Sequence, residues 1–449
     1  MFRKVLVANR GAVAARVIRA LDGLGIASVA VFSEADQDLP YLGRATEAHP
    51  IGPAPARESY LDQDKLLALA KSQSVDAIHP GYGFLSENAA FAGRVAEVGI
   101  TFIGPSAAHI EAMGEKTQAR ALVQQHGMPV ARGSGILGDD PAATARAAEA
   151  IGYPVLVKPA GGGGGIGMIA ATDEAALHKA VDRARSLAGR SFGSADVYLE
   201  KLIEQPRHIE FQVLGDKHGD VRHLFERDCS LQRRHQKIIE EATAPLIPRA
   251  EIEAIAERAV AVLRELGYDN IGTVEMLRGA DGSFGFLEMN TRLQVEHAVT
   301  EMLLGVDLVA SQIRAAAGEH LRDILPANLA PRGHAIEARV YAEDPKNFYP
   351  SPGPLTRFRP PAETDTLRVE TGYAEGCTVT PFYDPMLAKV IASGPDRAAA
   401  IARLSDALAA FEISGLKTNL PFLLRALADE RFRAGQVHTG LAAEILKTG

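Results

Sequence analysis

Residues 272–290, GTVEMLRGADGSFGFLEMN, are the stretch that most strongly indicates the fold. Two apolar runs flank a polar connector at 278–283. The connector contains Asp281 followed by Gly282, a dipeptide typical of hairpin turns. The segment therefore predicts two antiparallel strands joined by a tight turn.

The second strand of this predicted hairpin has polar side chains on one face. Positions two apart share a face of a strand, so Glu288 and Asn290 point together. Leu287 and Met289 are expected on the opposite, core face. Glu275 on the first strand can add its carboxylate to the polar face. Because Mg²⁺ prefers carboxylates completed by water and nucleotide phosphates, this set predicts a magnesium site. Solvated carboxylates on an exposed sheet are the alternative.

Upstream, residues 155–171, VLVKPAGGGGGIGMIAA, place a run of glycines between two apolar strands. Glycine lacks a Cβ and tolerates unusual φ values, so backbone amides of such a loop can close over phosphates. The run is not a Walker A loop, since Lys158 precedes the glycines and a strand follows them in place of a helix. We expect a hairpin lid over a nucleotide; a flexible linker is the alternative.

Two further segments indicate a polar ligand site. Residues 207–214, RHIEFQVL, alternate strictly, which places His208, Glu210 and Gln212 on one strand face. Residues 227–237, RDCSLQRRHQK, concentrate basic side chains, which indicates an anion site. A solvated basic loop is the alternative for the second segment.

The first third of the chain predicts a doubly wound α/β domain. Strands at 5–8 and 28–32 flank a helix at 13–21, and strands at 75–79 and 100–103 follow. Gly11 stands alone after the first strand, so the GxGxxG dinucleotide motif is missing. We therefore expect an α/β domain that binds no nucleotide by itself.

Composition limits the class of protein. The chain has 449 residues, 47% of them hydrophobic, and a net charge of −8, which argues against nucleic acid as a partner. Two cysteines are too few for a disulfide framework and suit a reducing compartment. A signal peptide and apolar runs of membrane-spanning length are both missing from the sequence. We expect a cytoplasmic protein that does not bind membranes.

Taken together, these segments resemble the biotin carboxylase family, from Lys4 to the C-terminus. The resemblance is specific because several of its motifs are long unbroken strings. They are ANRG (8–11), IHPGYGFLSEN (78–88), FIGP (102–105), RDCSLQRRHQK (227–237), EMNTRLQVEH (288–297) and YDPM (383–386).

The resemblance implies an α/β fold of the ATP-grasp type. It comprises an N-terminal Rossmann-like domain, a mobile glycine-rich lid and a C-terminal α+β domain, in a chain that forms a homodimer. The expected domains are 1–113, 114–330 with the lid at about 132–203, and 331–446.

The resemblance also implies a role for each site residue. The residues implied to bind ATP are Lys116, Lys158, Gly163, Gly164, Gly165, Glu200, Leu202, His208, Gln232 and His235. Those implied to bind two Mg²⁺ or Mn²⁺ ions are Glu275, Glu288 and Asn290. Those implied to bind bicarbonate are Lys237, Arg292, Gln294 and Val295. Those implied to bind biotin are Tyr82, Gly83 and Arg339. The implied catalytic residues are Glu296 as general base, Arg292, Arg339 and Lys237.

The implied activity is that of a ligase that carboxylates biotin. ATP phosphorylates bicarbonate, carboxyphosphate breaks down to CO₂ and phosphate, and phosphate deprotonates biotin, which attacks CO₂. The chain ends at Gly449 without a Met-Lys-Met attachment motif, so we expect biotin on a separate carrier protein and a separate carboxyltransferase subunit. Another ATP-grasp ligase, of the carbamoyl-phosphate or purine type, is one alternative. A regulatory nucleotide-binding protein that has lost turnover is the other.

One position departs from the family pattern. Related enzymes have Arg or Lys where this chain has Ile166, and a cationic lid side chain can contact the phosphates. We expect weaker ATP capture or looser lid closure, unless Lys116 and Lys158 supply the charge. A lower KM for ATP in Ile166→Arg would support the missing contact.

Overall fold

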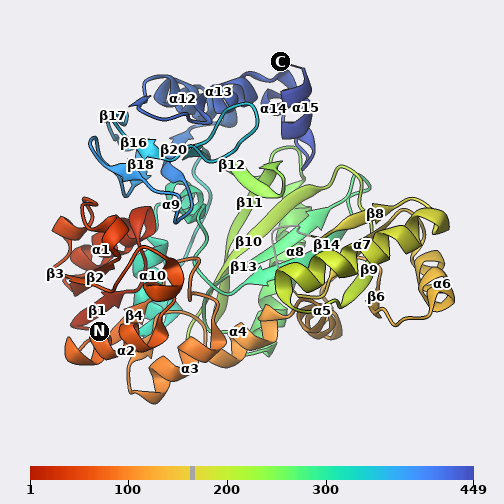
Figure 1. Cartoon of the computed structure of the whole chain (residues 1–449), viewed down its shortest axis with the longest axis horizontal. Coiled ribbons are helices and arrows are strands. Elements are labelled where there is room, and N and C mark those ends of the chain that lie inside the picture. The colour runs from red at the N-terminus through yellow and green to blue at the C-terminus, as the bar shows by residue number, and fades with distance from the viewer. Residues whose placement is uncertain (162–166, 449) are drawn as a thin grey trace.

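The computed structural model describes residues 1–161 and 167–448. The expected phosphate-binding residues Gly163, Gly164 and Gly165, and the lid residue Ile166, lie outside the described residues. Figure 1 shows an N-terminal α/β unit beside a long central sheet, with the C-terminal helices packed at one end of that sheet. The mixed α/β fold expected from the sequence is confirmed.

The N-terminal unit is built on a parallel sheet whose strands are buried on both faces. Val5 and Val7 lie in the core with α1 (Gly11–Gly23), whereas Leu6 lies in the core with α2 (Gln63–Ser72) and α3 (Ala89–Glu97). Helices on both faces explain the continuous apolar run at the N-terminus and confirm the doubly wound expectation. The strand order is β3 (Glu47–Pro50), β2 (Ala27–Phe32), β1 (Lys4–Val7), β4 (Ala77–His79) and β5 (Thr101–Phe102).

The central sheet is antiparallel and positions most of the site. Its order is β14 (Phe284–Asn290), β13 (Asn270–Arg278), β10 (Arg207–Gly215), β11 (Val221–Arg233), β12 (Gln236–Ala242), β15 (His334–Tyr341), β20 (Met386–Gly394) and β18 (Leu367–Thr371). Because β12 pairs with β15, this sheet crosses the expected boundary at 330/331. The second and third expected ranges therefore share one sheet, and the three domain ranges remain predictions.

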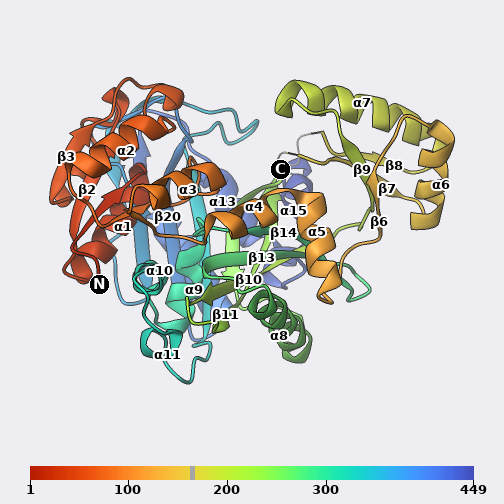
Figure 2. The same cartoon turned by 90° about the horizontal axis from the view of Figure 1, so that it is seen from below.

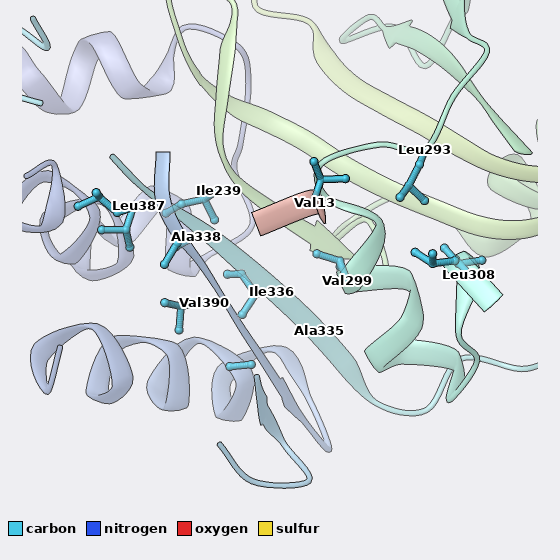
Figure 3. Packing of buried hydrophobic residues seen from close by; sticks show 14 of the residues in the cluster. Val13, Ile239, Leu293, Val299, Leu308, Ala335, Ile336, Ala338, Leu387 and Val390 are labelled. Atoms are coloured by element: carbon cyan, nitrogen blue, oxygen red, sulfur yellow. The ribbon is translucent and has the colours of Figure 1, made fainter. Parts of the chain in front are cut away.

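One apolar core joins the central sheet to its helices. Ile239 of β12, Ala338 of β15 and Val390 of β20 pack in the same cluster as Val299 of α9 (His297–Leu304). Figure 3 shows these side chains, with Val13 of the N-terminal unit close by. Val13 belongs to the same cluster, so the N-terminal unit and the central sheet share a core. This packing holds the N-terminal unit against the central sheet, and both line one cleft.

The lid is a separate four-stranded sheet with its own core. Its order is β6 (Gly133–Ile136), β9 (Val197–Lys201), β7 (Val155–Pro159) and β8 (Ile169–Ala171), covered by α6 (Pro141–Ile151) and α7 (Glu174–Phe192). Figure 2 shows this unit set apart from the N-terminal unit. β7 pairs antiparallel with β8, with Val157 opposite Ile169, which confirms the hairpin expected around the glycine run.

The remaining α-helices and β-strands lie around these sheets. They are α4 (Ala107–Gly114), α5 (Lys116–Gln125), α8 (Arg249–Glu265), α10 (Leu308–Ala316), α11 (Leu321–Ile324), β16 (Gly353–Pro354), β17 (Arg357–Arg359), β19 (Thr378–Val379), α12 (Arg397–Ala409), β21 (Glu412–Ser414), α13 (Leu420–Ala428), α14 (Glu430–Arg433) and α15 (Leu441–Lys447). Within the described ranges, every helix is too short or too polar to cross a membrane.

One expectation about the acidic hairpin is wrong in detail. The pairing register of β13 and β14 shifts between Glu275 and Met276, which leaves Leu287 as an extra residue in β14. Such a β-bulge breaks strict alternation of side chains. Leu287 therefore lines the cleft, while Phe286 and Met289 belong to the core.

Candidate active site

A cleft of about 1040 Å³ brings the predicted residues together. Residues of the N-terminal unit, the central sheet and the lid all line it. Its wall includes every predicted site residue that the structure describes, except Glu296, whose side chain is fully buried. The predicted residues in the wall are Tyr82, Gly83, Lys116, Lys158, Glu200, Leu202, His208, Gln232, His235, Lys237, Glu275, Glu288, Asn290, Arg292, Gln294, Val295 and Arg339.

Lys237 lies at the centre of an acidic group. Its Nζ is 2.5 Å from Glu210 Oε2, 2.8 Å from Glu275 Oε1 and 2.7 Å from Glu296 Oε1. Glu210 and Glu275 converge because they are direct partners across β10 and β13. Burial alone would lower the pKa of Lys237, but these carboxylates outweigh burial and hold that pKa well above its usual range. Lys237 is therefore a fixed positive charge at neutral pH.

Glu296 connects Lys237 to Arg339. Its second oxygen, Oε2, accepts a hydrogen bond from an Arg339 amino group at 2.8 Å. Burial would raise the pKa of Glu296, but the charges of Lys237, Arg339 and Arg227 outweigh burial and hold this pKa well below its usual range. Glu296 is therefore an ionised acceptor between two cations.

The expected metal-binding side chains lie together at the hairpin. Glu275 and Glu288 are cross-strand partners, and Asn290 Nδ2 donates to Glu275 Oε1 at 2.8 Å. Lys116 Nζ lies 2.7 Å from Glu288 Oε2. Carboxylate and carboxamide oxygens are the hard donors that Mg²⁺ prefers, so this set fits magnesium. Lys237 and Lys116 also contact Glu275 and Glu288, respectively.

Arg292 joins the central sheet to the N-terminal unit. Its guanidinium donates to Asn290 Oδ1 at 2.7 Å and to Gln294 Oε1 at 2.8 Å. Its Nε donates to Glu87 Oε2 at 2.7 Å, and the backbone N–H of Thr291 donates to the other oxygen of Glu87 at 3.1 Å. Glu87 thereby fixes the direction in which Arg292 enters the cleft.

The lid side of the cleft contains a second buried ion-pair group. Lys158 Nζ donates to Glu200 Oε2 at 2.7 Å, and Arg120 pairs with the other oxygen of Glu200. Burial lowers the pKa of Lys158, although Glu200 opposes this effect. Leu202 follows directly after β9, so Glu200 and Leu202 lie at the same end of this strand, and both line the cleft.

The polar stripe of β10 is confirmed. His208 and Glu210 face the site, while Ile209, Phe211 and Val213 belong to the core. Gln232 Nε2 lies 2.8 Å from His208 Nδ1, which ties β11 to this stripe.

The basic string 227–237 is a strand, a turn and a second strand, so the solvated-loop alternative is wrong. Its cations also do not gather around one anion. Arg227 is fully buried against Glu210, and Arg233 pairs with Glu343 outside the cleft. Lys237 and His235 line the cleft. Only the end of the string, at His235 and Lys237, therefore stays a predicted anion site.

The expected biotin-binding loop is held by Asn9. Asn9 Nδ2 donates to the carbonyl of Pro80 at 2.7 Å and to that of Tyr82 at 2.9 Å. Gly83 has a φ of +71°, a backbone conformation that favours glycine at this turn. The Tyr82 hydroxyl is buried and has no hydrogen-bond partner among the described residues.

Three residues that contribute to the site were given no individual role by the sequence. Glu210 lies in the recognised stripe, but its contact with Lys237 depends on the pairing of distant strands. Glu87 lies in a recognised string, yet its partner Arg292 is distant in the chain. Arg120 on α5 pairs with Glu200 of the lid, and nothing in the local sequence signals that contact.

A four-stranded lid beside an antiparallel sheet, with a charged cleft between them, is the architecture of an ATP-grasp ligase. Family models match as follows: the biotin carboxylase N-terminal domain at residues 1–110, the carbamoyl-phosphate synthase L chain ATP-binding domain at 115–324, and the biotin carboxylase C-terminal domain at 337–444. Biotin carboxylase 2 of Bacillus subtilis is 50% identical over 447 residues, covering 99% of this chain and 100% of that protein. The chain belongs to the biotin carboxylase family of ATP-dependent ligases.

Other relatives agree with this assignment. The biotin carboxylase of Halalkalibacterium halodurans is 48% identical, covering 100% of this chain and 98% of that protein. The biotin carboxylase domain dimer of Hydrogenobacter thermophilus 2-oxoglutarate carboxylase, in complex with MgADP, ADP and bicarbonate, is 44% identical with a TM-score of 0.94 and 99% coverage of both chains. The Campylobacter jejuni biotin carboxylase complex with β-γ-ATP is 42% identical with a TM-score of 0.95, again with 99% coverage of both.

Proposed function

We propose that the protein carboxylates biotin on a separate carrier protein, using ATP and bicarbonate and passing through carboxyphosphate. This is the first half-reaction of a biotin-dependent carboxylase. The observation that supports it most directly is that Glu296 contacts both Lys237 and Arg339. A proton acceptor for bicarbonate and a cation for the biotin enolate thus occur in one site. The MgADP and bicarbonate in the Hydrogenobacter relative support the same substrates here.

ATP is proposed to bind between the lid and the central sheet. Glu200 and Leu202 would hold the adenine, and Lys116 and Lys158 would contact the phosphates. The ribose and phosphates would lie along His208, Gln232 and His235. The backbone amides of Gly163, Gly164 and Gly165, outside the described residues, would close over the phosphates.

Magnesium is proposed to bind as two ions at Glu275, Glu288 and Asn290. Magnesium bound there neutralises phosphate charge that develops during phosphoryl transfer. Lys116 contacts Glu288, so this lysine would lie between the proposed phosphate position and the acidic hairpin.

Bicarbonate is proposed to lie against Lys237, Arg292, Gln294 and Val295. A bicarbonate oxygen attacks the γ-phosphorus and ADP leaves, while Glu296 accepts the bicarbonate proton. An anion that competes for Lys237 would weaken the hold of this lysine on Glu296. That change raises the pKa of Glu296 and makes it a better proton acceptor.

Biotin is proposed to lie between Arg339 and the loop at Tyr82 and Gly83. Carboxyphosphate breaks into CO₂ and phosphate, and phosphate removes the ureido N–H proton of biotin. The resulting enolate attacks CO₂ through nitrogen to give carboxybiotin. Arg339 offsets the enolate charge by a charge-assisted contact.

We further propose that the partners are a carboxyltransferase and a biotin carboxyl carrier protein, and that the chain acts as a homodimer in the cytoplasm. The relative from Hydrogenobacter is a domain dimer, which supports the homodimer. The domains proposed for the chain are 1–113, 114–330 and 331–446.

ADP release should be measured with ATP and magnesium, with and without bicarbonate and free biotin. We expect turnover that requires bicarbonate and rises with biotin. ADP release that ignores both would contradict the proposal. ATP binding without turnover would indicate a regulatory nucleotide-binding protein, and turnover stimulated by ammonia in place of biotin would indicate another ligase.

A further inference from the structure

Behind Arg339 lies a pair of buried carboxylates that the proposed mechanism does not use. Glu240 of β12 and Glu337 of β15 are direct partners across the two strands, and both are 0% exposed. Directly opposed residues of an antiparallel pair have Cβ atoms roughly 4.5–5.5 Å apart. The two acidic groups are therefore close neighbours away from water.

The cationic contacts of the pair are too weak to balance two negative charges. Arg339 Nε lies 2.6 Å from Glu240 Oε1, but that Nε has no hydrogen bond, so the contact is ionic and poorly aligned. Lys389 Nζ lies 3.9 Å from Glu337 and only 2.6 Å from Glu370. Both oxygens of Glu240 and both oxygens of Glu337 lack a hydrogen-bond partner among the described residues.

The cations that contact the pair are already matched by other carboxylates. Arg339 also contacts Glu296, and Lys389 also contacts Glu370. Two buried carboxylates cannot both ionise at close range when the nearby cations are already balanced. The groups that act electrostatically on the pair, from each packed element, are Arg339, Glu296, Lys237, Glu210, Cys229, Lys389, Glu370, Tyr82 and Tyr341.

We propose that Glu240 and Glu337 are positioning residues that share one proton, with Glu337 as the neutral acid and Glu240 as the anion that holds Arg339. The inference rests on the proposed function. When Glu296 accepts the bicarbonate proton, it loses its negative charge. Its ion pair with Arg339 is then lost. Glu240 is then the carboxylate that keeps the guanidinium in place for the biotin enolate.

The titration of the pair agrees with this assignment. Burial is the main cause that raises the pKa of Glu337 well above its usual range. Burial also raises the pKa of Glu240, to about 7, although Arg339 opposes the shift. A raised pKa means that Glu240 gains its proton as the pH falls through that value. The biotin-stimulated rate should therefore decline on the acid side of neutrality.

The test is the biotin-stimulated rate of ADP release between pH 6 and 8, with the bicarbonate ion concentration held constant. Glu240→Gln should lower kcat/KM for biotin by about tenfold or more and abolish the acid limb, while KM for ATP changes little. Glu337→Gln, which reproduces a neutral acid, should keep the acid limb where the unmodified protein has it. Infrared spectra at about pH 8, above the pKa of Glu240, should show a protonated-carboxyl band that Glu337→Gln removes.

Glu241→Gln is the matched control, because Glu241 is the next residue of β12 and pairs instead with His334 and Arg397. It should lower the thermal midpoint without changing biotin kinetics. Unaltered biotin kinetics and an unaltered acid limb in Glu240→Gln would overturn the inference, as would the absence of the carboxyl band, which can be measured even if that variant folds poorly. If the unmodified protein shows no stimulation by biotin, the proposed function itself fails.

Discussion

Glu275 and Glu288 face each other across the β13–β14 hairpin, and each contacts a different lysine. Lys237 Nζ lies 2.8 Å from Glu275, and Lys116 Nζ lies 2.7 Å from Glu288. The two lysines come from β12 and from the start of α5, so the hairpin contacts two elements that are distant in the chain. Each carboxylate can therefore be tested separately.

The first prediction concerns the metal requirement. Glu288→Gln keeps the shape of the side chain but removes a charge, so we expect a sharply higher Mg²⁺ concentration for half-maximal turnover. The measurement is a magnesium titration at saturating ATP. Glu251→Gln is the control, since Glu251 pairs with Arg278 and does not line the cleft. Superimposable titrations of the unmodified protein and Glu288→Gln would place the metal elsewhere.

The second prediction concerns the general base. Glu296→Ala should lower kcat by roughly 10²-fold or more, because it removes a proton acceptor used only during reaction. The affinity for ATP should change far less, since the lysines proposed to contact the phosphates, Lys116 and Lys158, do not contact Glu296. Turnover and equilibrium binding of a nonhydrolysable ATP analogue provide the comparison. Equal losses in both would show that Glu296 is structural.

The third prediction concerns the contact between Glu87 and Arg292. Glu87→Gln leaves Arg292 without its charged partner from the N-terminal unit, so we expect KM for bicarbonate to rise by about tenfold. KM for ATP should rise much less. Glu97→Gln, at the exposed end of α3, serves as the control from the same unit. If KM rises equally for both substrates, Glu87 acts on the whole cleft and not on the anion pocket.

The fourth prediction concerns acid stability. Glu301 is buried and pairs with Arg16 at 2.8 Å and with Arg368 at 2.6 Å. Burial alone would raise the pKa of Glu301, but these arginines outweigh burial and lower it to about 2. Because this pKa lies below the unfolded value, the stabilisation is present above about pH 4.5 and is lost as the pH falls towards 2.

Glu301→Gln should therefore destabilise the protein by roughly 3–5 kcal/mol at pH 7, with a smaller difference from the unmodified protein in acid. Thermal or urea unfolding across this pH range measures the effect. Glu412→Gln breaks a half-exposed pair with Arg357 and should cost less than about 1 kcal/mol. A destabilisation that does not depend on pH would assign the effect to packing.

The sequence by itself determined the local elements and the residue types of the site. Alternation placed Glu288 and Asn290 on one face of a strand because the side-chain period of a strand is fixed at two. The glycine run between two apolar strands predicted the lid hairpin for a similar reason, since it depends only on local backbone freedom. The specific strings around Tyr82 and Glu296 identified the family, and the matching relatives confirm that assignment.

Only the tertiary structure decided which charges meet. The bulge at Leu287 depends on the pairing of β13 with β14, and alternation within one strand contains no register information. Glu240 and Glu337 oppose each other because β12 pairs with β15, whose residues are distant in the chain. Electrostatic shifts depend on distance and burial, which a linear sequence does not specify. For that reason, the sequence predicted Arg339 as a site residue but not the buried acidic pair behind it.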